Sequence, residues 1–393
     1  MRIGIFTDTY FPQINGVTYT IDLWKKKLEE RGHEVLLFYP SSDYIPKKNE
    51  FPMRSFNFRF YEGYRVALPS WVIRNAKDLD MVHIHGMFSP AVAGVYVARR
   101  LKIPRMQTFH TPGDEYVGYV TKRRMIKKSL TKIYNFWEKK LLNSFEIVTC
   151  PSDVIKKRLT EKGIKNITVL ANGIDTDFFS PVDREEFRKK YCVESEKLIG
   201  FCGRICYEKR LEDLIGIADR FDGQIIIIGN GPAEKHYRRL ARRKKNVQFL
   251  GFLSKSDQRA FYSALDIFVF PSVAETQGLV ALEAMACGTP VVGANEMALK
   301  ETIKDGNTGY LYDSANLDDL ERKIFLAYKN RKRLSKKCIS YARSHSVDRT
   351  VDKLLSLYSR QISEFNKKEK KKSSLLLAGQ KLQHLFRERK DNR

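Results

Sequence analysis

Short apolar runs alternate with amphipathic stretches along most of the chain. The first run, residues 2–6, is followed by a polar loop at residues 7–17, a helical pattern that ends at Gly32, and a second apolar run at residues 33–40. Strands that alternate with helices in sequence form parallel sheets covered on both faces, so we predict an α/β fold with doubly wound sheets. The same order recurs at residues 80–86, 89–101 and 104–111.

A segment rich in turn signals divides the chain into two regions of this pattern. Residues 167–183 contain Asn-Gly and Ser-Pro dipeptides, which favour turns, and a chain of 393 residues is too long for one ordinary core. We predict an N-terminal domain at residues 1–175, a second domain at residues 176–345, a helix at residues 346–365 that packs back towards the first domain, and a basic tail at residues 366–393. The strands expected in the second domain lie within residues 197–204, 224–232, 247–253 and 265–272.

Two carboxylates, Glu275 and Glu283, lie eight residues apart around the start of a helix predicted near Gly278. Ligands of doubly wound sheets bind at the carboxyl ends of the strands, and Glu275 belongs to such a loop. Amides at a helix N-terminus bind phosphate, and carboxylates accept hydrogen bonds from sugar hydroxyls. A surface helix with solvated glutamates is the alternative interpretation. The amides expected at this terminus are those of Gln277, Gly278, Leu279 and Val280.

Two cations follow the first strand of the second domain. Arg204 and Lys209 lie five residues apart in one loop, where a guanidinium fork and a point charge can clamp a diphosphate. In the first domain, Gly16 lies in the loop after the first strand and offers flexible backbone at a helix start. Ordinary surface cations and a turn glycine are the alternatives.

Together these motifs resemble those of the family 4, or group 1, retaining glycosyltransferases. The resemblance implies the GT-B fold, in which two Rossmann-like domains face each other across a cleft. It also implies transfer of a hexose from a nucleotide sugar. The loop at residues 108–120 is similar to that of the membrane-associated branch that glucosylates diacylglycerol and glycolipids, which implies UDP-glucose as donor and a membrane lipid as acceptor. The motifs lie in the family's order at residues 2–17, 108–111, 171–175, 203–209 and 275–283.

The resemblance assigns roles around the donor. Arg204 and Lys209 hold the diphosphate, with help from Gly16 and the amides of Leu279 and Val280. Glu275 binds hydroxyls of the transferred hexose, and Glu283 binds the ribose. The loop after the next strand lies near the nucleotide and contains Asn230, Gly231 and Pro232.

His110 is the catalytic histidine that the resemblance implies, placed over the transferred sugar. A histidine at the end of a strand is also commonly a hydrogen-bonded structural residue. The neighbouring His83 and His85 are interpreted as strand residues and no more. The acceptor contacts implied by the loop are Asp114, Glu115 and Tyr116.

The implied chemistry needs no cofactor beyond the nucleotide sugar. A nucleoside diphosphate is a good leaving group, so the protein's main task is to stabilise its charge. In retaining enzymes of this kind the departing phosphate takes the acceptor proton on the same face, without a protein nucleophile. The donor loops contain no Asp-x-Asp pattern, so we expect no essential metal, and a divalent cation would be a non-essential addition.

Most of the net charge of +25 lies in four stretches, at residues 99–105, 121–140, 234–245 and 366–393. The second carries an apolar stripe at helical spacing, which favours either a membrane-surface helix or the core-facing side of a domain helix. The tail combines leucines with lysines, and a disordered basic tail is its alternative. The two elements together favour an anionic membrane surface as partner. The stripe consists of Ile126, Leu130, Ile133, Trp137 and Leu141.

Features that the sequence does not contain help to predict the cellular compartment and to weigh the competing functions. Six scattered cysteines and an N-terminus without a secretory pattern indicate reduced thiols in the cytoplasm. No apolar run reaches the roughly 18 residues of a membrane span, so we expect peripheral attachment to the inner face of the cell membrane. Extension of an oligosaccharide or polysaccharide is the alternative activity. Nucleic-acid binding is disfavoured because aromatic residues are not interleaved with the basic runs, and the oligomeric state stays open.

Overall fold

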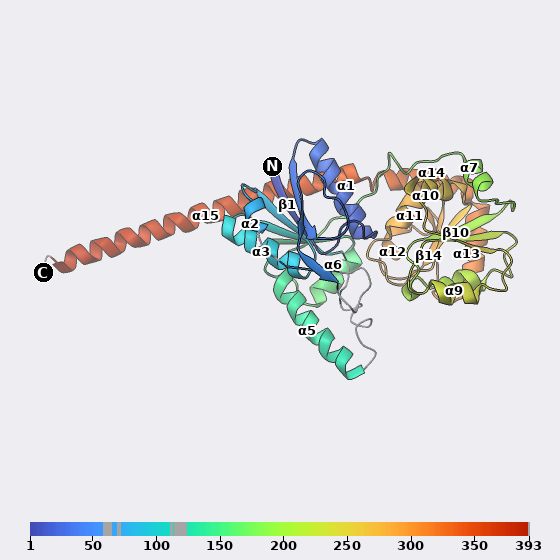
Figure 1. The fold of residues 1–393 in the computed structure, drawn as a ribbon, viewed down its shortest axis with the longest axis horizontal. Helices are drawn as coiled ribbons and strands as arrows, with labels where there is room; N and C mark the ends of the chain where they lie inside the picture. Colours follow the sequence, from blue (N-terminus) through green and yellow to red (C-terminus); the bar gives the residue numbers. More distant parts are fainter. Residues whose placement is uncertain (58–64, 69–71, 111–112, 114–123, 392–393) are drawn as a thin grey trace.

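Two doubly wound parallel sheets form the body of the protein, one in each half of the chain (Figure 1). The computed structural model describes residues 1–57, 65–68, 72–110, 113 and 124–391. The first sheet has the strand order β3-β2-β1-β6-β7-β8-β9, and the second has the order β12-β11-β10-β13-β14-β15. This is the α/β architecture that the alternation of apolar runs and helices predicts.

The first half of the chain builds the seven-stranded sheet. Its strands are β1 (Arg2–Thr7), β2 (Glu34–Pro40), β3 (Glu50–Met53), β6 (Met81–His85), β7 (Arg105–Thr108), β8 (Ile147–Cys150) and β9 (Ile167–Val169), and β4 (Ser55–Asn57) and β5 (Arg65–Ala67) form a separate antiparallel pair. Its helices are α1 (Gly16–Glu30), α2 (Val72–Asn75), α3 (Ser89–Leu101), α5 (Arg124–Leu142) and α6 (Asp153–Glu161).

The second half builds the six-stranded sheet. Its strands are β10 (Leu198–Cys202), β11 (Gln224–Ile228), β12 (Val247–Gly251), β13 (Ile267–Phe270), β14 (Val291–Ala294) and β15 (Gly309–Tyr312). Its helices are α7 (Arg184–Lys190), η1 (Tyr207–Lys209), α8 (Leu211–Gly216), α9 (Glu234–Leu240), α10 (Lys255–Ala264), α11 (Leu279–Ala286), α12 (Leu299–Thr302), α13 (Leu317–Lys329) and α14 (Arg331–Arg343). The last helix, α15 (Val347–Asp391), returns to the first sheet.

Each face of the first sheet has its own hydrophobic core. Successive strand residues point to opposite faces, so Ile5 packs on the side of α1 and α15, whereas Phe6 packs on the side of α3 and α6. On the first side Trp24 is fully buried beside Val351 and Leu354 of α15. The C-terminal helix is therefore part of the N-terminal core.

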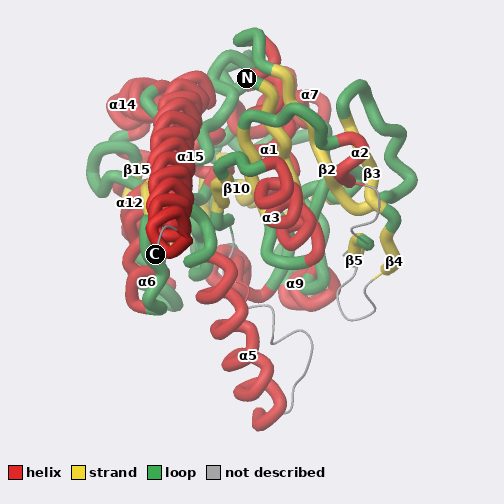
Figure 2. The backbone as a smooth tube through the Cα atoms, turned by 90° about the vertical axis from the view of Figure 1, so that its left-hand side faces the viewer, coloured by secondary structure: helices red, strands yellow, loops and turns green. Residues whose placement is uncertain are grey.

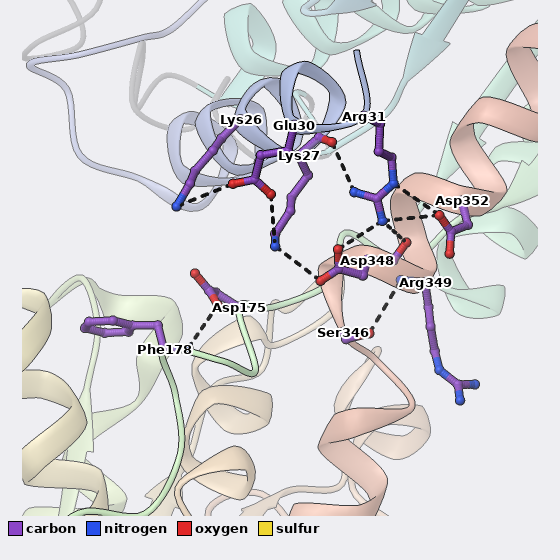
Figure 3. Close-up of polar contacts among 10 residues, drawn as sticks. All are labelled: Lys26, Lys27, Glu30, Arg31, Asp175, Phe178, Ser346, Asp348, Arg349 and Asp352. Carbon is purple, nitrogen blue, oxygen red and sulfur yellow. Dashed lines mark hydrogen bonds and ion pairs between the residues drawn. The ribbon is translucent and has the colours of Figure 1, made fainter. Parts of the chain in front are cut away.

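The chain crosses between the two halves twice, and the two crossings run side by side. Ile174 and Ser346 form an isolated parallel bridge, and the Ile174 N–H donates to the His345 carbonyl at 3.0 Å. Just beyond, Arg31, which follows the last residue of α1, contacts Asp348 at 2.9 Å and Asp352 at 3.2 Å (Figure 3). These ion pairs pin the start of α15 to α1.

The helix α15 is longer than the residue pattern predicts. A helix ending at residue 365 and a separate tail are expected, but one helix of 45 residues continues to Asp391. The lysine-rich stretch that follows residue 365 consists largely of good helix formers, and Gly379 is its first glycine. Figure 1 shows α15 extending far beyond the body, and Figure 2 shows it nearly end-on. Within the described residues, no helix combines the length and apolarity that crossing a bilayer requires.

Candidate active site

The loops at the carboxyl ends of the central strands of both sheets approach each other. In the first sheet the strand order reverses at β1 and β6, and in the second at β10 and β13. The Asn172 N–H donates to Oε1 of Gln277 across the two halves at 2.9 Å. A Cβ built on Gly16 would lie 3.7 Å from Leu279, so the start of α1 faces the start of α11.

Lys209 and Glu275 form an ion pair between the β10 and β13 loops. The Lys209 side chain is 16% exposed and that of Glu275 14%, and Nζ contacts Oε1 directly. Burial alone would lower the pKa of Lys209, but the Glu275 carboxylate more than offsets this and the pKa is raised. The Val273 N–H donates to the Glu208 carbonyl at 3.0 Å, which ties the two loops together. The Lys209 side chain is thus held in its charged form, in which it can bind a phosphate.

Two glycines let the β11 loop lie directly on the β10 loop. Gly229 has φ +126°, and a Cβ there would overlap the Gly203 carbonyl. A Cβ on Gly231 would overlap the Ile205 carbonyl, and the Ile205 N–H donates to the Asn230 carbonyl at 2.9 Å. Asn230 and Gly231 therefore adjoin the loop that carries Arg204, whose side chain is exposed.

The α11 N-terminus is shaped by Gly278. This residue caps the helix with φ +81°, and a Cβ there would lie 2.8 Å from Leu299. The expected amide of Gln277 lies at this terminus, but its side chain is turned to Asn172. Leu279 and Val280 begin the helix.

Glu283 lies one turn further along α11. Burial raises its pKa to about 7, while Lys255 and a hydrogen bond from the Tyr262 hydroxyl, at 3.1 Å, act in the opposite direction. Lys255 Nζ also lies 3.8 Å from the ring centroid of Tyr19, which belongs to α1. Tyr262, Lys255 and Tyr19 are absent from the predicted site.

His110 follows β7 and contacts His85, the last residue of β6. Nε2 of His110 lies 2.8 Å from Nδ1 of His85, and the rings stack with centroids 5.1 Å apart. Burial lowers the pKa of His110 to about 4, and that of His85 lies well below its usual range for the same reason. His85 is a strand residue, as expected, but it also contacts the predicted catalytic histidine, and this contact arises from the pairing of β6 with β7.

Family models match both halves of the chain. "Glycosyltransferase Family 4" matches residues 14–178, and "Glycosyl transferases group 1" matches residues 183–345. The alpha-monoglucosyldiacylglycerol synthase of Streptococcus pneumoniae is 32% identical over 337 residues, which cover 79% of this chain and 75% of that protein. The chain belongs to the family 4, group 1 glycosyltransferases.

Further relatives place this glycosyltransferase among GT-B enzymes. The enzyme of the same name from Acholeplasma laidlawii is 29% identical over 345 residues, covering 80% of this chain and 85% of that protein. The structure of Anabaena HepE in complex with UDP matches 92% of this chain and all of that one, with a TM-score of 0.75 at 18% identity. The predicted family, GT-B fold and hexosyltransferase class are confirmed.

The three residues predicted to contact the acceptor lie outside the part of the chain that the structure describes. They are Asp114, Glu115 and Tyr116. Within the described ranges, no cluster of three or more His, Cys, Asp or Glu side chains is arranged to hold a metal.

Proposed function

We propose that this glycosyltransferase moves glucose from UDP-glucose to a membrane lipid, such as diacylglycerol or a glycolipid, with retention of the anomeric configuration. Two relatives are named as alpha-monoglucosyldiacylglycerol synthases, and HepE was solved with UDP-glucose as well as with UDP. The observation that carries the acceptor class is an exposed apolar face on the basic helix α5.

Most of that face belongs to the part of α5 that leaves the body of the protein (Figures 1 and 2). Among the described residues, Leu141 and Leu142 at the C-terminal end of α5 enter the core, and one turn earlier the indole N–H of Trp137 donates to the Met87 carbonyl at 2.9 Å. Among lysines such as Lys128 and Lys132, large apolar side chains are open to solvent. A helix of this composition binds an anionic bilayer by apolar insertion and charge. We call this the α5 face; its residues are Met125, Ile126, Ile133, Phe136 and Trp137.

We propose that the nucleotide sugar binds at the loops that follow β10 and β13 in the second domain. Arg204 and Lys209 hold the diphosphate, and the amides of Leu279 and Val280 add the partial positive charge of a helix N-terminus. Glu275, whose carboxylate already contacts Lys209, binds hydroxyls of the glucose. Glu283 receives the ribose, and Gly16, with Asn230 and Gly231, lines the nucleotide side.

The reaction then needs charge stabilisation more than a protein nucleophile. As the bond between the anomeric carbon and the phosphate oxygen breaks, negative charge builds on the diphosphate beside Arg204 and Lys209. The leaving oxygen takes the proton of the acceptor hydroxyl on the same face of the sugar. His110 lies over the sugar, and the products are UDP and the glucosylated lipid.

The proposed location follows from the same surfaces. The enzyme attaches peripherally to the inner face of the cell membrane through the α5 face, with the basic extension of α15 as a second contact. Exposed lysines at positions 367, 368 and 370–372 supply charge on that extension.

The deciding experiment supplies purified protein with UDP-, GDP- and ADP-glucose and anionic vesicles that contain diacylglycerol. Formation of glucosyldiacylglycerol from UDP-glucose alone is expected, and Lys209→Met should abolish it. Turnover only when soluble saccharides replace the vesicles would overturn the lipid acceptor and favour oligosaccharide or polysaccharide extension.

A further inference from the structure

His85 and His110 share a hydrogen bond in which only one ring can donate. Their contact joins Nδ1 of His85 to Nε2 of His110 at 2.8 Å. Burial lowers the pKa of both rings, so each is neutral near pH 7 and carries one ring proton. The other nitrogen of each ring decides where that proton resides.

The second nitrogen of His85 favours one arrangement. Its Nε2 is buried and has no hydrogen-bond partner among the described residues. Buried N–H groups without an acceptor are rarer in proteins than buried acceptors without a donor. The His85 proton therefore resides on Nδ1, from which it donates to Nε2 of His110. The proton of His110 must then reside on its own Nδ1.

His83 does not compete for this bond, although its ring lies 4.1 Å from that of His85. Its Nδ1 lies 2.6 Å from the Tyr358 hydroxyl, and its Nε2 lies 2.7 Å from the Thr108 hydroxyl. Both of its nitrogens are thus occupied. Trp24 also packs against His85, with ring centroids 5.6 Å apart, and its ring lies 6.0 Å from that of His83. His85 is held in place by packing and has His110 as its hydrogen-bond partner.

We propose that His85 is a positioning residue that fixes His110 in the Nδ1–H form, so that His110 donates a hydrogen bond to a hydroxyl of the transferred sugar. This inference rests on the proposed function, because that function places His110 over the sugar. With Nε2 taken by His85, Nδ1 is the ring atom left to meet a ligand. A donor fixed before the sugar arrives costs no reorganisation during the reaction.

Nuclear magnetic resonance of protein with ¹⁵N-labelled histidine tests the proton position without activity. The signals of His110 and His85 are assigned by comparison with His110→Gln and His85→Leu. We expect His110 in the Nδ1–H form in the parent protein and a mixed or Nε2–H form in His85→Leu. Tyr358→Phe, which alters only the neighbouring His83 chain, should leave the His110 signals unchanged. A parent protein with His110 in the Nε2–H form overturns the proposal.

Kinetics test the consequence. His85→Leu should lower kcat about tenfold, the size of one hydrogen bond, with little change in the KM for the donor. His85→Asn keeps an N–H near the position of Nδ1 and should restore most of kcat while keeping the fold. Equal losses in both variants would contradict a positioning role. If the parent protein transfers no glucose, the proposed function fails, but the proton position of His110 is still decided by resonance.

Discussion

The hydroxyl of Tyr358 lies 2.6 Å from Nδ1 of His83, a residue 275 positions earlier in the chain. The bond belongs to a chain whose direction is determined at its far end, where the Thr149 hydroxyl donates to the Gln107 carbonyl. Thr108 must then donate to Thr149, His83 to Thr108, and Tyr358 to His83. The C-terminal helix is thereby hydrogen-bonded to the centre of the first sheet.

Replacing Tyr358 by phenylalanine removes the donor at the head of this chain. The buried Nδ1 of His83 is left unpaired, which should lower the free energy of unfolding by about 1–3 kcal/mol in urea titrations. Tyr96→Phe is the control, because its ring is 58% exposed and surface changes stay within about 0.5 kcal/mol. Equal stability of the two variants would show that the hydroxyl of Tyr358 contributes nothing.

Substitutions of Lys209 and Glu275 should have different effects on UDP binding. Lys209→Met is expected to weaken UDP binding about tenfold or more, whereas Glu275→Gln should leave it within about threefold, because only the first contacts phosphate in the proposed site. Both should lower kcat/KM for UDP-glucose about a hundredfold or more. Titration calorimetry and initial rates measure the two effects. Lys197→Met, which removes a surface ion pair of the same domain, should change neither.

Glu301 links the two halves at the start of α6. Its carboxylate oxygens accept the Asp153 N–H at 2.9 Å and the Val154 N–H at 2.6 Å. Glu301→Ala removes both bonds and a favourable charge at a helix N-terminus, so the halves should separate more in the nucleotide-free protein. Small-angle scattering should report a larger radius of gyration. Glu296 precedes α12, the helix that contains Glu301, and Glu296→Ala should have the radius of gyration of the parent protein. An unchanged radius in Glu301→Ala would rule out a restraint at this contact.

The α5 face should determine vesicle binding. Ile133→Ser should lower partitioning onto anionic vesicles about tenfold, since insertion of its side chain is worth about 1.5–3 kcal/mol when complete. Phe325→Ser is a matched control, because both side chains are 66% exposed and Phe325 lies on α13 of the other domain. Sedimentation with vesicles measures both. Equal losses would move membrane attachment away from α5.

Nucleotide binding should depend on pH through Glu283. Its pKa of about 7 means that the free enzyme binds a proton there below neutrality. An ionised carboxylate accepts two ribose hydroxyls, so binding favours the charged form and releases a proton. UDP affinity should therefore be about tenfold weaker at about pH 6 than at about pH 8. Calorimetry in two buffers measures the released proton, and Glu283→Gln should flatten the dependence.

The strands with long apolar runs give the clearest signal in the sequence. The four isoleucines of β11 and the apolar runs around β10 and β13 predict a buried parallel sheet. The strands β8 and β14 are as short as β13, but β13 consists of four large apolar residues, whereas β8 ends in Thr-Cys and β14 in Gly-Ala, so their apolar signal is weaker. The strand β3 contains a proline suited to a sheet edge.

The candidate site was predictable where its signal is local and missed where it depends on packing. Residue types and spacing within single loops are enough to predict Lys209 and Glu275 as donor-site residues. The contact of His85 with His110 depends on the pairing of β6 with β7, and Glu301 meets α6 only through the placement of one domain on the other. No window of sequence contains either relationship.

Because α15 is one uninterrupted helix, a small rotation near its first residue produces a large displacement at its far end. Its first residue adjoins the double crossing between the domains, and 45 residues at 1.5 Å each give a rod about 68 Å long. Because α15 packs into the core of the first domain, a rotation of that domain by only about 5° about Val347, relative to the second domain, would move the far end of the helix through about 6 Å. Small angular changes at the crossing are thus magnified into displacements as large as a helical turn at the basic end of the chain.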